Sequence, residues 1–210
     1  MMAEEKRNNK LGQQIVKALK ARHFDAYYCI SKEEASDKIM SLIPDNNVVS
    51  WGGSTTMEEL GIIERVKKTN TVIDRAEAKS PEERTELMRK ALLCDTYLMS
   101  TNAITEDGEL VNIDGNGNRT AAMMFGPKNV IIACGMNKIV KDIPAAISRA
   151  RNTAAPINAN RFDVQTPCNA TGVCADCKSA QSVCTYIVRT RLSKPQGRIK
   201  VVLIGEALGF

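Results

Sequence analysis

The chain has 210 residues, of which 43% are hydrophobic and 25% are charged, and its formal net charge is +5. This length suits one domain with a well-buried core and argues against two full domains. The modest positive charge and the 4% aromatic content do not favour a dedicated nucleic-acid-binding protein.

The N-terminus and the apolar segments predict a cytoplasmic protein. The first ten residues, MMAEEKRNNK, are charged and lack the apolar region of a signal peptide. No run of about 18 apolar residues predicts a membrane span. Because persistent disulfides are rare in a reducing compartment, clustered cysteines there are typical of metal sites or redox-active thiols.

The first half of the chain alternates between expected helices and strands. An amphipathic helix is predicted over residues 4–22, and a later one begins at Ser31, which forms a capping box with Glu34. The other expected elements are strands at 25–30, 47–51, 71–75 and 96–101, and helices from 55 or 56, over 62–68 and over 80–95. This order predicts an α/β fold with a mostly parallel sheet and helices on both faces.

The second half departs from this alternation. Apolar and polar residues alternate within 102–114 on both sides of Asp107-Gly108, and this pattern predicts a β-hairpin. The remaining expectations are a short helix within 115–127, a strand over 129–135, a helix over 139–152 that contains Pro144, and a last strand over 199–206. Segment 160–190 is rich in cysteine, and we expect it to bind metal within the same single domain, 1–210.

The stretch SWGGSTT indicates an anion-binding turn. A predicted strand ends here in Gly52 and Gly53, and the hydroxyl residues Ser54 and Thr55 follow at a helix start. Glycines allow a ligand to approach the backbone closely, and free amides favour an anion. The alternative is a tight turn in which Thr55 is an ordinary helix cap. The stretch matches neither common nucleotide-binding motif.

A second polar stretch, TNAITEDGELVNIDGNGNRT, predicts further ligand contacts. Open α/β sheets bind ligands at the carboxyl ends of their strands, so we expect Asn102 and Asn116 to contact a ligand there. We expect Asp114 and Arg119, in the same stretch, to act as a catalytic pair. A carboxylate can accept a substrate proton, and a guanidinium can grip a substrate carboxylate. Lys138, after another strand, is expected to contact an anion; the alternative is a solvated lysine.

Four cysteines near the C-terminus have the spacing C-x5-C-x2-C-x6-C and predict a metal site. They are Cys168, Cys174, Cys177 and Cys184. Four thiolates within one turn-rich segment suit a [4Fe–4S] cluster or a zinc ion. Structural zinc usually uses two C-x2-C pairs, and only one is present, so the spacing favours the cluster over zinc. The other cysteines, Cys29, Cys94 and Cys134, lie in apolar segments and are expected in the core.

Four long motifs together resemble the lactate-utilisation (LUD) domain family. They are WGGSTTMEELGI, STNAITEDGELVNIDGNGNR, FGPKNVIIACGMNKIV and PCNATGVCADCKS, and the resemblance covers residues 12–191. It implies a fold similar to ribose-5-phosphate isomerases, CoA transferases and formyltetrahydrofolate cyclo-ligases. In that wider group the turn matching Gly52 to Thr55 holds an anionic part of the substrate. Some members belong to iron–sulfur complexes that oxidise lactate; this sequence lacks their C-x2-C-x2-C-x3-C-P runs.

Two classes of function follow from these features. One is an iron–sulfur accessory or subunit in the oxidation of lactate or another 2-hydroxyacid, or in related electron transfer, which would need a redox partner subunit. The alternative is a non-redox enzyme acting on a small anionic metabolite that bears a phosphate, a carboxylate or CoA, with the cysteines stapling a lobe through zinc or a cluster. The sequence leaves the oligomeric state open.

Overall fold

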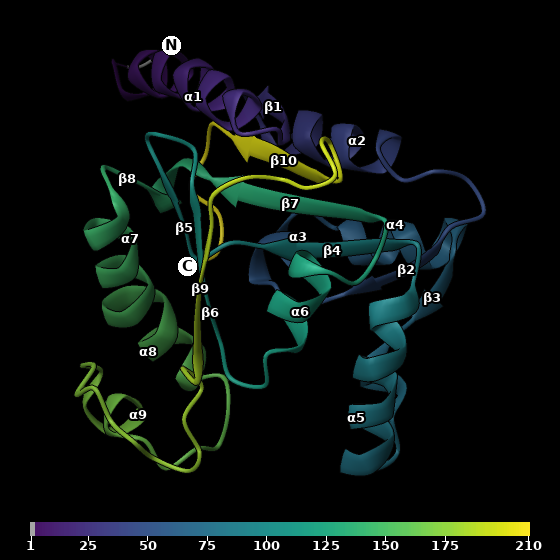
Figure 1. The fold of residues 1–210 in the computed structure, drawn as a ribbon, viewed down its shortest axis with the longest axis vertical. Coiled ribbons are helices and arrows are strands. Elements are labelled where there is room, and N and C mark those ends of the chain that lie inside the picture. Colours follow the sequence, from purple (N-terminus) through teal and green to yellow (C-terminus); the bar gives the residue numbers. More distant parts are fainter. Residues whose placement is uncertain (1–2) are drawn as a thin grey trace.

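The computed structural model describes residues 3–210, and its centre is a six-stranded sheet (Figure 1). The strand order is β1-β10-β7-β4-β2-β3, and every neighbouring pair is parallel. These strands are β1 (Asp25–Cys29), β2 (Val48–Trp51), β3 (Thr71–Ile73), β4 (Thr96–Ser100), β7 (Asn129–Gly135) and β10 (Ile199–Ile204). The predicted α/β fold with a mostly parallel sheet is therefore confirmed.

Helices cover both faces of this sheet, because its central strands are apolar on both sides. In β7, Val130 and Ile132 point to one face, and Ile131 and Ala133 point to the other. The first face packs against α1 (Ala3–Ala21) and α6 (Asn118–Met124). The second packs against α2 (Lys32–Ser41), α3 (Thr55–Glu59) and α4 (Ile62–Thr69). The cysteines expected in the core, Cys29, Cys94 and Cys134, are buried.

A second sheet of four strands has the order β8-β5-β6-β9. Its strands are β5 (Ala103–Thr105), β6 (Leu110–Asp114), β8 (Ile139–Val140) and β9 (Tyr186–Thr190). The pair β5 and β6 is antiparallel, which confirms the predicted hairpin, and Gly108 in its turn has φ of 79°. Helix α7 (Ile143–Arg149), a π-helical turn (Ala150–Ala154) and α8 (Ala155–Ala159) cover one side of this sheet.

The remaining elements extend from these two sheets. They are α5 (Pro81–Lys90), α9 (Pro167–Thr171) and the 3₁₀ turns η1 (Arg75–Glu77), η2 (Ala91–Leu93) and η3 (Met136–Lys138). Figure 1 shows α9 and its cysteine-containing loop at the far end from α1, below α8. No helix within residues 3–210 is both long enough and apolar enough to cross a membrane.

The helix predicted over residues 139–152 was wrong at its start. Ile139 and Val140 form β8, which pairs with β5, and the helix begins only after Asp142. Asp142 caps it by accepting a hydrogen bond from the amide of Ala145, and Pro144 occupies its first turn. Proline is favoured there because its missing N–H would have no partner inside the helix. Pro144 therefore starts the helix instead of interrupting it.

Candidate functional site

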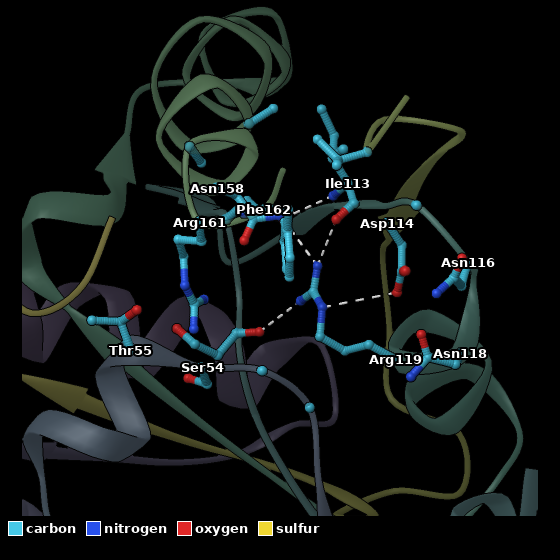
Figure 2. A pocket seen from close by; sticks show the side chains of 18 of the residues that line it. Ser54, Thr55, Ile113, Asp114, Asn116, Asn118, Arg119, Asn158, Arg161 and Phe162 are labelled. Carbon is cyan, nitrogen blue, oxygen red and sulfur yellow. Dashed lines mark hydrogen bonds and ion pairs between the residues drawn. The ribbon is translucent and has the colours of Figure 1, made fainter. Parts of the chain in front are cut away.

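A cavity of about 740 Å³ lies at the carboxyl ends of the parallel strands (Figure 2). The residues that follow β2, β3, β4 and β7 all contribute to its wall, as open α/β sheets commonly arrange. The end of α8 and the segment 180–183 enclose it from the side of the second sheet. The predicted ligand contacts and catalytic pair all line this one cavity: Gly52, Gly53, Ser54, Thr55, Asn102, Asp114, Asn116, Arg119 and Lys138.

The turn after β2 presents backbone amides to the cavity. The amide of Gly52 still donates to the carbonyl of Leu98, so the hydrogen bonding between β2 and β4 continues to the first residue of the turn. The hydroxyl of Ser54, rather than that of Thr55, caps α3 by accepting from the amide of Met57. Within the described part of the chain, no group accepts a hydrogen bond from the amide of Gly53 or Ser54. These two donors are available to a ligand.

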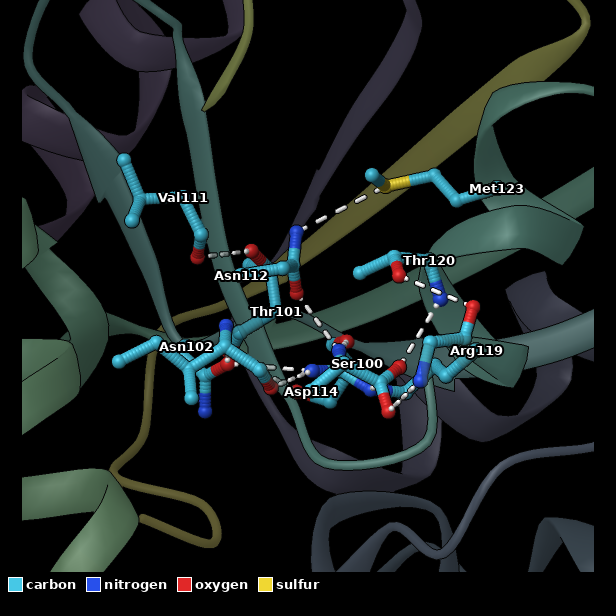
Figure 3. Close-up of polar contacts among 11 residues, drawn as sticks. Ser100, Thr101, Asn102, Val111, Asn112, Asp114, Arg119, Thr120 and Met123 are labelled. Carbon is cyan, nitrogen blue, oxygen red and sulfur yellow. Dashed lines mark hydrogen bonds and ion pairs between the residues drawn. The ribbon is translucent and has the colours of Figure 1, made fainter. Parts of the chain in front are cut away.

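The guanidinium of Arg119 is held on several sides by protein oxygens (Figure 3). Its Nη1 donates to the carbonyl of Ser100 at 2.8 Å and to Oδ1 of Asn112 at 2.6 Å. Its Nη2 donates to Oδ1 of Asn102 at 3.1 Å and to the carbonyl of Ile113 at 2.7 Å. Arg119 therefore joins the end of β4 to the end of β6 and fixes the shape of the cavity wall between the two sheets.

Both carboxylate oxygens of Asp114 accept hydrogen bonds from backbone amides a few residues later in the chain. One oxygen accepts from the amide of Gly117 and the other from the amide of Thr120, each at 3.0 Å. The second oxygen also lies 3.9 Å from Nε of Arg119. Asp114 thus caps the start of α6 and orients Arg119. The contacts give both residues a positioning role, and their catalytic role stays a prediction.

Lys138 places a buried amine at the cavity. Its side chain belongs to a residue that is only 2% exposed, and its Nζ donates to the hydroxyls of Thr56 at 2.9 Å and Ser100 at 3.0 Å. No carboxylate within residues 3–210 forms an ion pair with it. Burial lowers the pKa of this amine to about 8. An ammonium has three N–H donors, so one remains for a ligand.

Arg75, which the sequence analysis did not single out, is a second cation of the cavity wall. It follows β3 directly, and its guanidinium makes no hydrogen bond or ion pair within the part of the chain that the structure describes. Burial lowers its pKa from the usual arginine value. Its position just after a strand could have indicated a cavity residue, but the strand predicted over 71–75 included residue 75 itself.

The four clustered cysteines lie together beside the cavity, on α9 and the loop that follows it. Cys168 is buried and the other three are half-buried. Burial raises the pKa of Cys184 to about 11, and negative charge on Cys168, Cys174 and Cys177 acts in the same direction. Arg151 contributes a positive charge, with Nη2 3.9 Å from the sulfur of Cys174.

The donor chemistry of this lobe suits a thiolate-bound metal group, because soft thiol ligands select zinc and iron–sulfur clusters. In the conformation described for residues 3–210, no three Cys, His, Asp or Glu side chains converge closely enough to hold a metal ion. Cys174 and Cys177 belong to the loop between α9 and β9, so their sulfurs would have to come together when a metal binds. The cavity touches this loop between Cys177 and Cys184.

Comparison with solved structures shows the same fold in another protein. A DUF162 family protein from Deinococcus radiodurans has a TM-score of 0.53 and 14% identity, over 94% of this chain and 98% of that chain. Ribose 5-phosphate isomerase A from Methanocaldococcus jannaschii has a TM-score of 0.35 and 17% identity, over 53% of this chain and 55% of its own. For eIF2B beta from Chaetomium thermophilum the TM-score is 0.40 and the identity 16%, over 55% of this chain and 44% of that one.

No curated protein has a significantly similar sequence. The sequence model of the LUD domain, in contrast, matches residues 12–204, which is nearly the whole chain and includes both sheets, the cysteine loop and the cavity wall apart from Phe210. The predicted resemblance is confirmed, and the chain belongs to the LUD domain family.

Proposed function

We propose that this LUD domain binds a small anionic metabolite, such as a 2-hydroxyacid, in the cavity at the carboxyl edge of the larger sheet. The observation that carries the proposal is the environment of Lys138. Its amine is almost completely buried, and among residues 3–210 it is hydrogen-bonded only to two neutral hydroxyls. A buried charge without an opposite charge destabilises the folded protein, and an anionic ligand would supply that opposite charge.

The other cavity groups support the binding of such a ligand. The free amides of Gly53 and Ser54 and the guanidinium of Arg75 add donors on the same wall as Lys138. Asp114 and Arg119 hold the loop between the two sheets in place, so that Asn102 and Asn116 can reach the ligand. A carboxylate or a phosphate would fit these donors, because both accept several charge-assisted hydrogen bonds.

A second candidate function is electron transfer through a metal group on the cysteine lobe. The observation that favours it is that residues 180–183, between Cys177 and Cys184, form part of the cavity wall. A [4Fe–4S] cluster bound there would supply one-electron chemistry, whereas zinc would only crosslink the lobe. With a cluster, the protein would serve as an accessory or subunit of a 2-hydroxyacid-oxidising system and would need a redox partner subunit as electron acceptor.

Calorimetric titration of the full chain with L-lactate, D-glycerate and inorganic phosphate tests the binding proposal. We expect Lys138→Met to weaken the binding of the best ligand by tenfold or more, because one charge-assisted hydrogen bond contributes about 1.5–3 kcal/mol. Lys141→Met is the matched control, since Lys141 is exposed and pairs with Glu106 outside the cavity wall. Equal binding by both variants, or no binding of any anion by the unmodified chain, would contradict the proposal.

A further inference from the structure

Arg75 is left without a partner because the acid beside it is already used. Asp74 is 4% exposed, and its Oδ2 lies 2.8 Å from Nζ of Lys67. Its Oδ1 accepts a hydrogen bond from the amide of Ala76, also at 2.8 Å. Both oxygens of the adjacent carboxylate therefore have partners, and Asp74 acts on Arg75 through its charge without forming an ion pair with it.

The guanidinium of Arg75 lies directly against the glycine turn. A Cβ atom added to Gly53 would come within 2.6 Å of Nη2 of Arg75, so the guanidinium borders the backbone of this glycine directly. Arg84 donates from Nη1 to the carbonyl of Arg75 and also lines the cavity, which adds a second positive charge. The free amide of Gly53 and these two cations border one small region, which we call the Arg75 subsite.

A tyrosine side chain lies on the other side of the turn. Tyr97 is 1% exposed, and a Cβ atom added to Gly52 would be 3.5 Å from its hydroxyl oxygen. This hydroxyl forms no hydrogen bond with any residue from 3 to 210. Its oxygen is not among the fully buried atoms of residues 3–210 that lack a partner, so water or a ligand can bond to it.

Lys138 and Arg75 contact the same turn at two different points. Lys138 bonds to Thr56, whereas Arg75 lies against Gly53. Three peptide steps separate Gly53 from Thr56, and such a segment spans at most about 11 Å. Both side chains also line the same cavity. No acidic side chain of residues 3–210 forms an ion pair with either of them.

We propose that the ligand of this cavity carries two anionic groups, one bound by Lys138 and the other by the Arg75 subsite. The inference rests on the proposed function and makes it more specific. It identifies the ligand as a hydroxy acid with a second acidic group, either a carboxylate or a phosphate, rather than as a simple monocarboxylate such as lactate.

Two matched pairs of probes test this inference by calorimetric titration of the full chain. L-Malate is L-lactate with one additional carboxylate, and 3-phospho-D-glycerate is D-glycerate with one additional phosphate. We expect at least one bis-anion to bind about tenfold or more tightly than its mono-anionic counterpart. A preference for L-malate over L-lactate identifies the second group as a carboxylate. A preference for 3-phospho-D-glycerate over D-glycerate identifies it as a phosphate.

Three variants locate the effect. Arg75→Gln should weaken the binding of the bis-anion at least tenfold more than that of the mono-anion, and Arg75→Lys should retain part of the preference. Arg89→Gln is the matched control, because Arg89 is exposed on α5 and pairs with Glu86. Among residues 3–210 the guanidinium of Arg75 has no hydrogen-bond or ion-pair partner, so its loss should not unfold the chain.

Equal affinities for both members of each pair would overturn the inference. So would an Arg75→Gln variant that weakens mono-anions and bis-anions by the same factor. Failure of the proposed function itself has a different signature: Lys138→Met would then bind every probe as tightly as the unmodified chain, or the unmodified chain would bind no anion.

Discussion

Lys138 carries its charge at a place that water hardly reaches, and this makes its effect on stability depend on pH. Its pKa of about 8 lies below the ordinary value of 10.5 because burial penalises the charged form. Between these two pH values the unfolded chain binds more protons than the folded chain. Stability attributable to Lys138 therefore rises as the pH increases from about 8 to 10.5, by roughly 3 kcal/mol.

We accordingly predict that Lys138→Met is more stable than the unmodified chain at pH 7 and that this advantage disappears toward pH 10.5. Urea unfolding of both proteins at several pH values measures this difference in the free energy of unfolding. The buried thiols of Cys29 and Cys94 have raised pKa values and act in the opposite direction, but they do so in both proteins. The charge of Lys138 lowers the pKa of Cys134, so both proteins should carry Cys134→Ala in this comparison. The difference between the two proteins isolates Lys138, and a difference that does not change with pH would count against the assignment.

Arg119 and Asp114 are expected to affect stability as well as ligand binding. Arg119→Lys cannot reproduce four hydrogen bonds to two strand ends, and the melting temperature should fall by roughly 5–10 °C. Asp114→Asn should cost about 1–2 kcal/mol, because an amide can accept from only one of the two α6 amides. Calorimetric melting of both variants measures these losses, and unchanged melting with loss of ligand binding would instead favour the predicted catalytic pair.

At the scale of single residues, the cavity wall was largely predictable. Gly52 and Lys138 each follow an apolar strand of the larger sheet, and the carboxyl ends of parallel strands meet at one edge. Asp114 instead ends β6 of the second sheet, in which its neighbours are antiparallel. The partners of each side chain were not predictable, because they depend on long-range geometry. Nothing in the sequence indicates that Arg119 bonds to Ser100, or that Ser54 caps α3 instead of Thr55.

Among the secondary-structure elements, the local patterns predicted most helices and strands, and the pairing between distant segments was not predicted. The strand β9 pairs with β6, although about 70 residues of chain separate the two strands. The loop before β9 showed only its cysteines as a recognisable pattern. The two-residue β8 is too short to produce an alternating pattern. As a result, the second sheet beyond its hairpin was missed.

Arg198 at the start of β10 is predicted to hold α6 against the larger sheet. It is 9% exposed and donates to the carbonyls of Ala122, Met123 and Pro127 at the end of that helix. Arg198→Met would leave these buried acceptors without partners, at a cost of about 2–4 kcal/mol. Urea unfolding measures the loss. The exposed control Arg89→Met should change stability by less than about 0.5 kcal/mol, and equal effects of the two variants would contradict this role.

The cysteine lobe gives a prediction about metal content. Anaerobically purified protein should contain about four iron and four sulfide per chain and should lose its colour with dithionite. Cys174→Ser should abolish this content, because it removes one of the four thiolates. Cys94→Ala is the control, since Cys94 is buried outside the lobe. Stoichiometric zinc without iron would contradict the cluster and leave the lobe with a structural metal.

In the molecule as a whole, the cavity depends on both sheets. The larger sheet supplies Lys138, Arg75 and the turn at Gly53, while the second sheet and α8 supply the opposite wall. Arg119 joins the two by bonding to the ends of β4 and β6. A ligand that binds here contacts elements from nearly the whole length of the chain, and it should therefore stabilise the entire fold against unfolding.

Titration of the Lys138 amine by NMR, with and without ligand, tests the central claim most directly. In the free protein the midpoint should lie near pH 8. A bound anion favours the charged amine, so saturating L-malate or 3-phospho-D-glycerate should raise the midpoint by about one pH unit or more. The affinity should then fall by up to about tenfold per pH unit as the pH rises above the free midpoint. A midpoint that stays the same when the ligand is bound would contradict the account.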